Sequence, residues 1–352
     1  MKICCYTVSL NEENYVDAWV LANKEADYLV VIDTGSTDNT VEKLRDHGVL
    51  VHSIKIHPWR FDDARNTALA LVPDDTDVCI SVDMDEGMSE FWRQELEKYW
   101  IPDTTRLSYT YHHSMDALGN PINSFMADKC HARFGYRWQR PVHETVFPIG
   151  INEQIVNAPS VQMVHNQDTI KSRQSYLPLL IQSHKDMPNC SQTLFWLARE
   201  YASYNQNEEA ITHFKKYLAM PEATWPDERS EAMNWLSKLM PHEILKWLRL
   251  ACAEAPYRRE VWLNISEYYH KNENWINLYA TAKEGLKISN KCNNYLDNPH
   301  AWTGHLWDLA GLGAWSINLR NESLVLFEEA AKLSPNDKRI QDNYIVVKGL
   351  VI

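Results

Sequence analysis

The chain has 352 residues, with 47 acidic against 35 basic side chains and a formal net charge of −12. Its 45% hydrophobic and 11% aromatic residues exclude a disordered chain, and its length allows two domains with separate cores. No apolar run is long enough to cross a membrane as a helix, so stable membrane insertion is not expected. Seven scattered cysteines without a Cys-x-x-Cys pair argue against a disulfide framework and against a zinc site.

These features predict a cytoplasmic protein. Met1–Leu10 is too short and polar for a signal peptide and is typical of a first strand. The acidic net charge disfavours a nucleic-acid backbone as a general partner. The stretch Lys129–Arg140, however, carries four Lys or Arg side chains and a histidine, so a local basic groove that faces an anionic group stays open.

The first 170 residues alternate between apolar strand-like runs and helical patterns. Strands separated by crossover helices of this length predict a Rossmann-like α/β domain with a mostly parallel sheet. In such a sheet, ligands bind beyond the carboxyl ends of the strands, so the polar residues there are the candidate site. The expected strands are Ile3–Val8, Tyr28–Ile32, Val49–Ile56 and Val78–Val82, and the expected helices are Asn14–Glu25, Thr40–Asp46 and Asp62–Leu71.

The second half reads as helices with a repeat of about 34 residues. Tetratricopeptide-like units end at Pro221, Pro256, near Asn290 and at Pro335, and the longer last interval predicts an insertion at Lys291–His300. Unrelated amphipathic helices are the alternative. We therefore expect an α/β domain over residues 1–170, a helical join over 171–190 and an all-α repeat domain over 191–352.

The first candidate segment follows the second expected strand and reads Asp-Thr-Gly-Ser-Thr-Asp over residues 33–38. Asp33 ends the strand, Gly35 permits a tight turn, and Ser36 can cap the next helix. A carboxylate at a strand end can accept hydrogen bonds from a base or a ribose. A good turn and helix cap would explain the same residues.

The second candidate segment follows the fourth expected strand and reads Asp-Met-Asp-Glu-Gly over residues 83–87. Its three acids repel one another, and a divalent cation would stabilise them. Oxygen ligands suit Mg²⁺ or Mn²⁺, which can then bridge to diphosphate oxygens. A solvated acidic turn is the alternative.

Between these segments, the helical run Phe61–Leu69 carries Arg65, which could meet a nucleotide base or phosphate or form a surface salt bridge with Asp62. The three segments, in this order, resemble the family 2 glycosyltransferases, which are inverting enzymes of the GT-A fold. The opening Ser9–Glu13 resembles the first loop of that family, where the donor nucleotide is received.

The resemblance continues beyond these motifs. Gly135–Glu144 resembles the segment ending in Val-His-Glu in members that carry tetratricopeptide repeats, and Val164–Asn166 resembles the point where a late histidine closes the metal or diphosphate site. Leu197–Tyr201 resembles the start of the repeats in those proteins. The Gln-x-x-Arg-Trp helix of processive synthases is absent, so processive polymer synthesis is not expected.

The resemblance implies a nucleotide-sugar-binding GT-A domain that uses Mn²⁺ or Mg²⁺ and a nucleotide-sugar donor as co-substrate. It implies that Asp85 and His165 are metal ligands. The residues that it implies for donor binding all follow strands or lie between them: Ser9, Asn11, Glu12, Asp33, Gly35, Ser36, Arg65, Asp83 and Met84.

The resemblance also implies an acceptor hydroxyl or thiol that attacks the anomeric carbon, and a general base that takes its proton. It places Glu144 at the acceptor face as this base, with Asp128 in reserve. An ion pair between Glu144 and a neighbouring arginine is the alternative.

Substrate and partners are open. The family makes a UDP-hexose of the UDP-glucose type the expected donor, while the acceptor could be a polypeptide, a glycan or lipid precursor, or a hydroxylated base in DNA as in some phages. The repeats could bind a peptide or form a homodimer. The alternative function is a non-catalytic tetratricopeptide scaffold with an inactive α/β domain. A nucleotidyltransferase is disfavoured, because no glycine-rich phosphate loop with a lysine follows the first strand.

Overall fold

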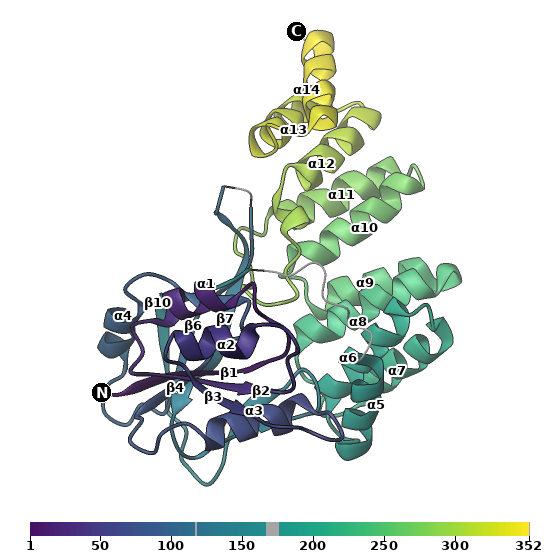
Figure 1. Ribbon diagram of the computed structural model, residues 1–352. Coiled ribbons are helices and arrows are strands. Elements are labelled where there is room, and N and C mark those ends of the chain that lie inside the picture. The colour runs from purple at the N-terminus through teal and green to yellow at the C-terminus, as the bar shows by residue number, and fades with distance from the viewer. Residues whose placement is uncertain (117, 167–175, 352) are drawn as a thin grey trace. The chain divides into compact units, whose positions relative to one another are not determined.

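A computed structural model of the protein describes residues 1–116, 118–166 and 176–351 (Figure 1). The chain forms two compact units, Met1–Asp186 and Met187–Ile352. Residues 171–175 of the expected join lie outside the described residues. The part of the join that belongs to the first unit forms helix α5 (Tyr176–Asp186).

An eight-stranded sheet in the order β3-β2-β1-β4-β7-β6-β10-β5 forms the centre of the N-terminal unit. Four of its strand pairs are parallel and three are antiparallel. The strands are β1 (Ile3–Ser9), β2 (Tyr28–Asp33), β3 (Leu50–Ser53), β4 (Val78–Ser81), β5 (Glu86–Met88), β6 (Arg106–Met115), β7 (Pro121–Ala132) and β10 (Ile155–His165). A separate two-stranded sheet pairs β8 (Tyr136–Gln139) with β9 (Thr145–Pro148).

Both faces of this sheet are covered, because successive side chains of β1 point to opposite faces and almost all of them are apolar. Ile3 and Cys5 pack in one core with α1 (Val16–Asn23), α2 (Thr40–Asp46) and α4 (Trp92–Tyr99). Cys4 and Tyr6 pack in the other core with α3 (Phe61–Ala70) and the β8–β9 sheet. The loops at the carboxyl ends of β1, β2 and β4 therefore follow strands that are almost completely buried.

The predicted first half of this unit is confirmed, since all four expected strands and all three expected helices form. The third strand is shorter than Val49–Ile56, because β3 lies at the edge of the sheet and pairs only along Leu50–Ser53. The expected helix Asn14–Glu25 starts two residues later, at Val16. The antiparallel part of the sheet and α4 were not expected from the sequence.

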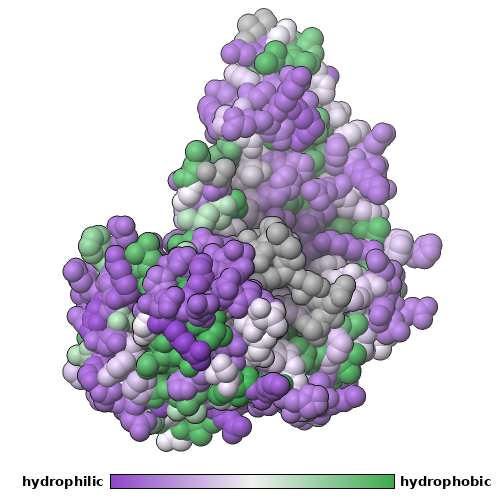
Figure 2. Space-filling model, in the orientation of Figure 1, coloured by the Kyte–Doolittle hydropathy of each residue, from purple (hydrophilic) through white to green (hydrophobic). Residues whose placement is uncertain are grey.

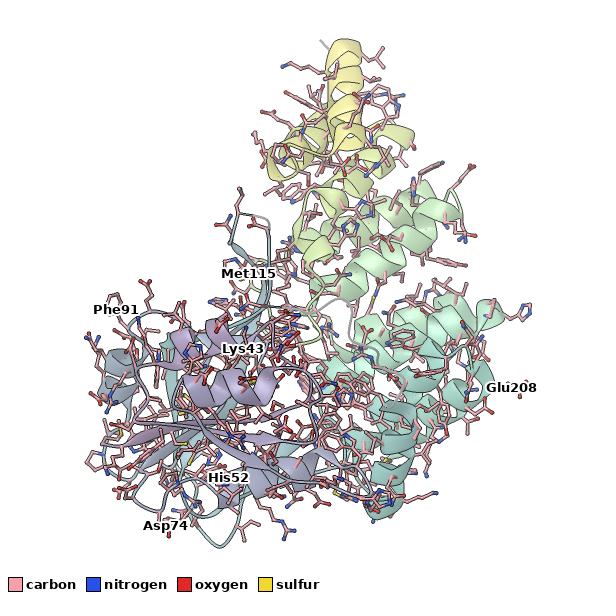
Figure 3. All side chains as sticks on the ribbon, viewed as in Figure 1. Lys43, His52, Asp74, Phe91, Met115 and Glu208 are labelled. Atoms are coloured by element: carbon pink, nitrogen blue, oxygen red, sulfur yellow. The ribbon has the colours of Figure 1, made fainter. Side chains whose placement is uncertain are left out.

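The long β6–β7 hairpin extends beyond the body of the N-terminal unit, and Met115, at the end of β6, lies toward its tip (Figures 1 and 3). Figure 2 shows hydrophilic and hydrophobic residues interspersed over the visible face of this unit. Within the described ranges, no helix has both the length and the hydropathy that a membrane crossing requires.

The C-terminal unit is an array of antiparallel helix pairs, as the repeat predicts. Its α-helices are α6 (Ser191–Ser203), α7 (Asn207–Ala219), α8 (Pro226–Leu239), α9 (Ile244–Glu254), α10 (Arg259–Lys271), α11 (Trp275–Leu286), α12 (His305–Ser316), α13 (Arg320–Leu333) and α14 (Lys338–Val351). A 3₁₀ turn, η1 (Pro241–Glu243), precedes α9. The predicted architecture, a mostly parallel α/β domain followed by an all-α domain of helical repeats, is confirmed.

Small residues lie where these helices touch. A Cβ atom at Gly313 would come within 2.8–2.9 Å of the backbone of Tyr279 on the neighbouring α11, a separation that real Cβ atoms essentially never show. Close helix packing therefore requires glycine at this position, in keeping with the small residues that the repeat predicts in general at helix contacts.

The predicted insertion lies between α11 and α12 and contains a 3₁₀ turn, η2 (Pro299–Trp302). It packs back onto earlier repeats of the same unit. The Tyr295 ring stacks on Trp196 of α6 with the ring centroids 5.3 Å apart, and its hydroxyl donates to Glu228 of α8 at 2.8 Å. The insertion thus contacts helices that are not its neighbours in the repeat order.

Candidate functional site

The carboxyl ends of three parallel strands meet at one edge of the N-terminal sheet. Ser9 of β1 is the register partner of Asp33 of β2, and Tyr6 of β1 is the partner of Ser81 of β4. The segments that follow β1, β2 and β4 therefore lie next to one another, although they are far apart in the sequence. This edge is the candidate site.

The loops after β1 and β2 are joined by hydrogen bonds. The Asn11 backbone N–H donates to Ser36 Oγ at 2.8 Å, and the Thr37 N–H donates to Asn11 Oδ1 at 2.8 Å. The N–H of the buried Glu12 donates to Thr40 Oγ1 at 2.7 Å. The structure thus brings together Asn11, Glu12 and Ser36, which were predicted to bind the nucleotide-sugar donor. We call the two joined loops, which follow β1 and β2, the double loop.

The Asp33 side chain holds the loop after β2 through hydrogen bonds to its backbone. Its side chain is 3% exposed, and its Oδ2 atom accepts from the N–H groups of Gly35 at 3.0 Å and Ser36 at 3.1 Å. Ser9 Oγ donates to Asp33 Oδ1 at 3.4 Å. Gly35 has a φ of +121°, which glycine adopts without strain. The Asp33 carboxylate therefore holds the turn, and a contact with a base or ribose stays a prediction.

Arg65 joins α3 to the end of β4 and to the segment before β9. Its guanidinium lies over the Trp138 ring at 4.9 Å, donates to Ser81 Oγ at 2.9 Å and pairs with Asp83 at 2.9 Å. It also pairs with Glu144. Arg65 is buried, so the surface salt bridge with Asp62 weighed from the sequence is wrong.

The partner of Asp62 is instead Arg60, which lies two residues away and also pairs with Asp186. Arg65 is separate from that cluster because the helical arrangement turns it toward the sheet. The guanidinium of Arg65 already binds Ser81, Asp83 and Glu144. It can therefore act on a ligand mainly by positioning the two carboxylates.

Asp83 lies between two cations. Lys129 of β7 places its Nζ 3.4 Å from Asp83 Oδ2 and 3.2 Å from Glu86 Oε1. Burial raises the pKa of Asp83, but the charges of Arg65 and Lys129 outweigh it and hold that pKa well below its usual range. Asp83 is therefore an anion at every physiological pH, and its side chain stays 33% exposed.

Glu86 completes the turn after β4. It accepts from the Asp83 backbone N–H at 2.9 Å and from the Tyr111 hydroxyl at 2.8 Å. The Glu86 side chain is only 3% exposed. Glu86 therefore holds the backbone of the acidic turn in place and is too buried to contact a ligand.

Asp85 and His165 form the second part of the site. His165 ends β10, and its Nε2 atom lies 3.6 Å from Asp85 Oδ2. The Asn166 N–H donates to the Asp85 carbonyl oxygen at 2.7 Å, which holds the two segments together. Burial opposes protonation of His165, but the Asp85 carboxylate outweighs it and raises the pKa of His165. The His113 ring stacks on His165 with centroids 5.4 Å apart.

The remaining predicted residues lie in different surroundings. Glu144 is close to the site through Arg65, and its side chain is 11% exposed. Asp128 pairs with Arg106 at 3.1 Å, outside the Arg65–Asp83 network, so the structure does not bring it to the other candidates. The Met84 side chain is 4% exposed in the sheet core, which leaves only its backbone for a ligand.

Sequence reasoning missed several residues that the structure places in the site. The sequence points to Lys129 only as part of a basic stretch, and its motifs do not point to Tyr111, His113 or Trp138. The available signal was the alternation of polar and apolar residues at the start of β6, which places Tyr111 and His113 on one face of the strand. The sequence of β7 does not alternate in this way and gives no such signal for Lys129.

The basic groove over Lys129–Arg140 that the sequence left open does not form. Lys129 faces the acidic turn, whereas Arg133 is buried and donates to the Val72 carbonyl at 2.7 Å. Burial lowers the pKa of His131 to about 4, so this histidine is neutral at pH 7. The strand alternation and the turn after β7 disperse these charges.

No protein-family model and no curated protein matches the chain. Among solved structures, S. aureus TarS is similar over 73% of this chain and 55% of its own, at 12% identity and a TM-score of 0.42. Glucosyl-3-phosphoglycerate synthase from Mycobacterium tuberculosis, solved with Mn²⁺ and UDP-glucose, covers 31% of this chain and 43% of its own, at 21% identity and a TM-score of 0.27.

The thermophilic TPR protein TTC0263 from Thermus thermophilus is similar over 50% of this chain and 90% of its own, at 18% identity and a TM-score of 0.33. Because all three TM-scores are below 0.5, the function has to be inferred from the residues of the site itself.

Proposed function

We propose that the N-terminal unit is a metal-dependent glycosyltransferase. It would move a hexose from a nucleoside diphosphate sugar of the UDP-glucose type to a hydroxyl or thiol of an acceptor. One observation carries the proposal. A carboxylate and an imidazole, Asp85 and His165, lie 3.6 Å apart beside an acidic turn that Arg65 and Lys129 hold rigid, at the edge of the sheet where ligands bind.

The donor atoms at this position fit a divalent metal ion. The 3.6 Å between Asp85 Oδ2 and His165 Nε2 is long for a hydrogen bond, and one ion can bind both atoms. A mixed oxygen and nitrogen pair suits Mn²⁺, and the carboxylate also suits Mg²⁺. Among the residues that the structure describes, no third His, Cys, Asp or Glu donor joins this pair, so diphosphate oxygens and water would complete the coordination.

When bound, the ion would neutralise charge on the diphosphate leaving group. The protein would contribute rigid positioning. Arg65 and Lys129 hold Asp83 as an anion that is partly exposed and suited to accept a hydrogen bond from a ribose hydroxyl. The Asn11–Ser36 double loop, braced by Asp33, would receive the base.

Glu144 is the proposed general base. Its carboxylate pairs with Arg65 at the edge of the site, and a carboxylate oxygen can accept a proton from the acceptor. The acceptor hydroxyl or thiol would pass its proton to this carboxylate as the bond to the anomeric carbon forms. The acceptor class stays open between a protein side chain, a glycan or lipid precursor and a hydroxylated DNA base.

A thermal-shift panel tests the proposal with UDP, GDP, CDP and dTDP and their sugars, each with and without Mn²⁺. Ligand at a hundredfold above its Kd should stabilise the unit by about 2.7 kcal/mol. We expect one nucleotide to give a Mn²⁺-dependent shift that Asp85→Ala abolishes and the exposed control Asp46→Ala retains. If no nucleotide shifts the transition, the scaffold function replaces the enzyme.

A further inference from the structure

Three metal-type side chains converge in the C-terminal unit, each from a different element. Glu267 lies on α10, His300 on η2 and His305 at the start of α12, and one donor atom of each lies within 4.8 Å of the others. His305 Nε2 is 3.2 Å from Glu267 Oε1. The two imidazole rings are stacked, with centroids 4.3 Å apart and planes at 30°.

The backbone that carries the two histidines is fixed. Asn298 Oδ1 accepts from the His300 N–H at 3.0 Å, so the side chain of Asn298 caps η2. Thr303 Oγ1 donates to the His300 carbonyl at 2.9 Å and accepts from the His305 N–H at 3.3 Å. Both histidines are therefore held close together by the same short segment, and rotation of the stacked rings about their side-chain bonds is the ordering that a common ion would require.

The charges around the cluster leave the Glu267 side of His305 suited to a cation. A guanidinium has no acceptor, so Arg339 donates to His305 Nδ1 at 3.4 Å, and its other nitrogen pairs with the buried Asp308 at 2.5 Å. The proton of a neutral His305 then lies on Nε2 and points at Glu267. A metal ion would replace this proton, while Arg339 keeps its pairing with Asp308.

Two imidazole nitrogens and one carboxylate oxygen are the donors that Zn²⁺ takes in three-residue sites, with water in the fourth position. We propose that Glu267, His300 and His305 bind a single Zn²⁺ ion. The ion would tie the insertion before α12 to α10, because its three ligands come from α10, η2 and α12. This site is separate from the proposed transferase chemistry and does not depend on it.

Isothermal titration of the full chain with Zn²⁺ tests the proposal. The chain should carry Asp85→Ala, so that the N-terminal pair does not contribute. We expect one Zn²⁺ per chain. Because even outer-shell partners contribute roughly tenfold to hundredfold to metal affinity, Glu267→Gln, His300→Ala and His305→Ala should each weaken binding at least about tenfold.

His270→Ala is the matched control, because His270 is an exposed histidine of the same helix as Glu267 and lies outside the cluster. It should leave Zn²⁺ binding unchanged. Unchanged affinity in both histidine variants of the cluster, or no binding to the Asp85→Ala chain, would overturn the proposal. Far-UV circular dichroism of each variant shows whether it has folded.

Co²⁺ absorption gives a test that needs no variant of the cluster. A His₂Glu site gives visible d–d bands of Co²⁺ without thiolate-to-metal charge transfer, and Zn²⁺ should displace the Co²⁺. Charge-transfer bands in the near ultraviolet would instead assign the ion to a cysteine, such as Cys292 of the insertion, and would overturn the proposal.

Discussion

At the scale of single residues, Arg65 is the side chain on which the candidate site depends most. It is 9% exposed, and its partners Asp83 and Glu144 are both carboxylates. A buried cation between two anions is costly to remove, because the anions are left without compensation.

Arg65→Met should therefore destabilise the N-terminal unit by about 3–5 kcal/mol. Urea unfolding followed by circular dichroism measures this change. Arg45→Met is the control, since Arg45 is exposed and its replacement should stay within about 0.5 kcal/mol. Equal effects of the two changes would contradict the role assigned to Arg65.

Glu144→Gln tests the general base. Loss of a base typically costs roughly 10²–10⁴ in rate, so kcat should fall by that much while the donor KM changes little. The acidic limb of the pH profile of kcat/KM should also disappear. A merely positioning role would lower kcat and keep that limb. Glu90→Gln, an exposed control, should leave both quantities unchanged.

His131 makes the N-terminal unit sensitive to acid. Its Nδ1–H donates to the Ala132 carbonyl at 2.8 Å, and its Nε2 accepts from the Tyr6 hydroxyl at 3.0 Å, which itself accepts from Trp138 Nε1 at 2.8 Å. Protonation of Nε2 would break this chain. Burial accordingly lowers the pKa of His131 from 6.5 to about 4.

Because the unfolded chain binds this proton at a higher pH than the folded chain does, the contribution of His131 to stability is complete above pH 6.5 and is lost as the pH falls toward 4. The loss should reach about 3 kcal/mol. Urea unfolding of wild type and His131→Gln across the range from neutral pH down to the folded-state pKa measures it. The difference between the two proteins should change over this range, and a constant difference would contradict the assignment.

Much of the site could be predicted from the sequence, because its acids directly follow strands. Asp83, Asp85 and Arg65 belong to short local motifs, and His165 was found through a resemblance. Lys129 could not be found in this way, since it comes from a strand that is distant in the sequence from the acidic turn. Only the pairing of β7 with β4 brings it there.

At the scale of helices and strands, predictability follows burial. The strands β1, β2 and β4 are apolar along almost their whole length, so their pattern is unambiguous. By contrast, β7 is mostly half-buried or exposed and mixes polar with apolar residues. Its sequence alone therefore gives little indication of a strand. Tertiary pairing decides its conformation.

Helix contacts in the repeats allow a matched pair of substitutions. Gly313→Ala should destabilise the C-terminal unit by about 1–3 kcal/mol, because its Cβ would meet the Tyr279 backbone. Gly349→Ala, also within a helix, meets nothing within 4 Å and should stabilise by about 0.5–1 kcal/mol through helix propensity. Thermal unfolding measures both, and effects of the same sign would contradict the packing described for Gly313.

At the scale of the whole molecule, the two units offer different metal chemistry. The N-terminal pair has one carboxylate and one imidazole, whereas the C-terminal cluster has one carboxylate and two imidazoles. Imidazole-rich sites favour Zn²⁺, and oxygen-rich sites completed by diphosphate favour Mn²⁺ or Mg²⁺. The scattered cysteines gave no sign of either metal, because no cysteine belongs to either set of proposed ligands.

Differential scanning calorimetry of the full chain should therefore resolve two responses. UDP with Mn²⁺ should raise the transition of the N-terminal unit, and Zn²⁺ at a concentration near one equivalent should raise that of the C-terminal unit. Asp85→Ala should remove only the first response and His305→Ala only the second. A single transition that both ligands raise together would show that the units unfold as one.

The insertion gives the repeat array a property that stacked helix pairs usually lack. In a simple solenoid each repeat touches only its neighbours, so the array can fray from either end, one repeat at a time. Here Tyr295, which lies after α11, is anchored to Trp196 of α6 and Glu228 of α8. Because these contacts join the segment after α11 to α6 and α8, unfolding of any repeat between them breaks contacts of the others. We therefore expect the part of the array from α6 to α11 to unfold more cooperatively than a simple solenoid.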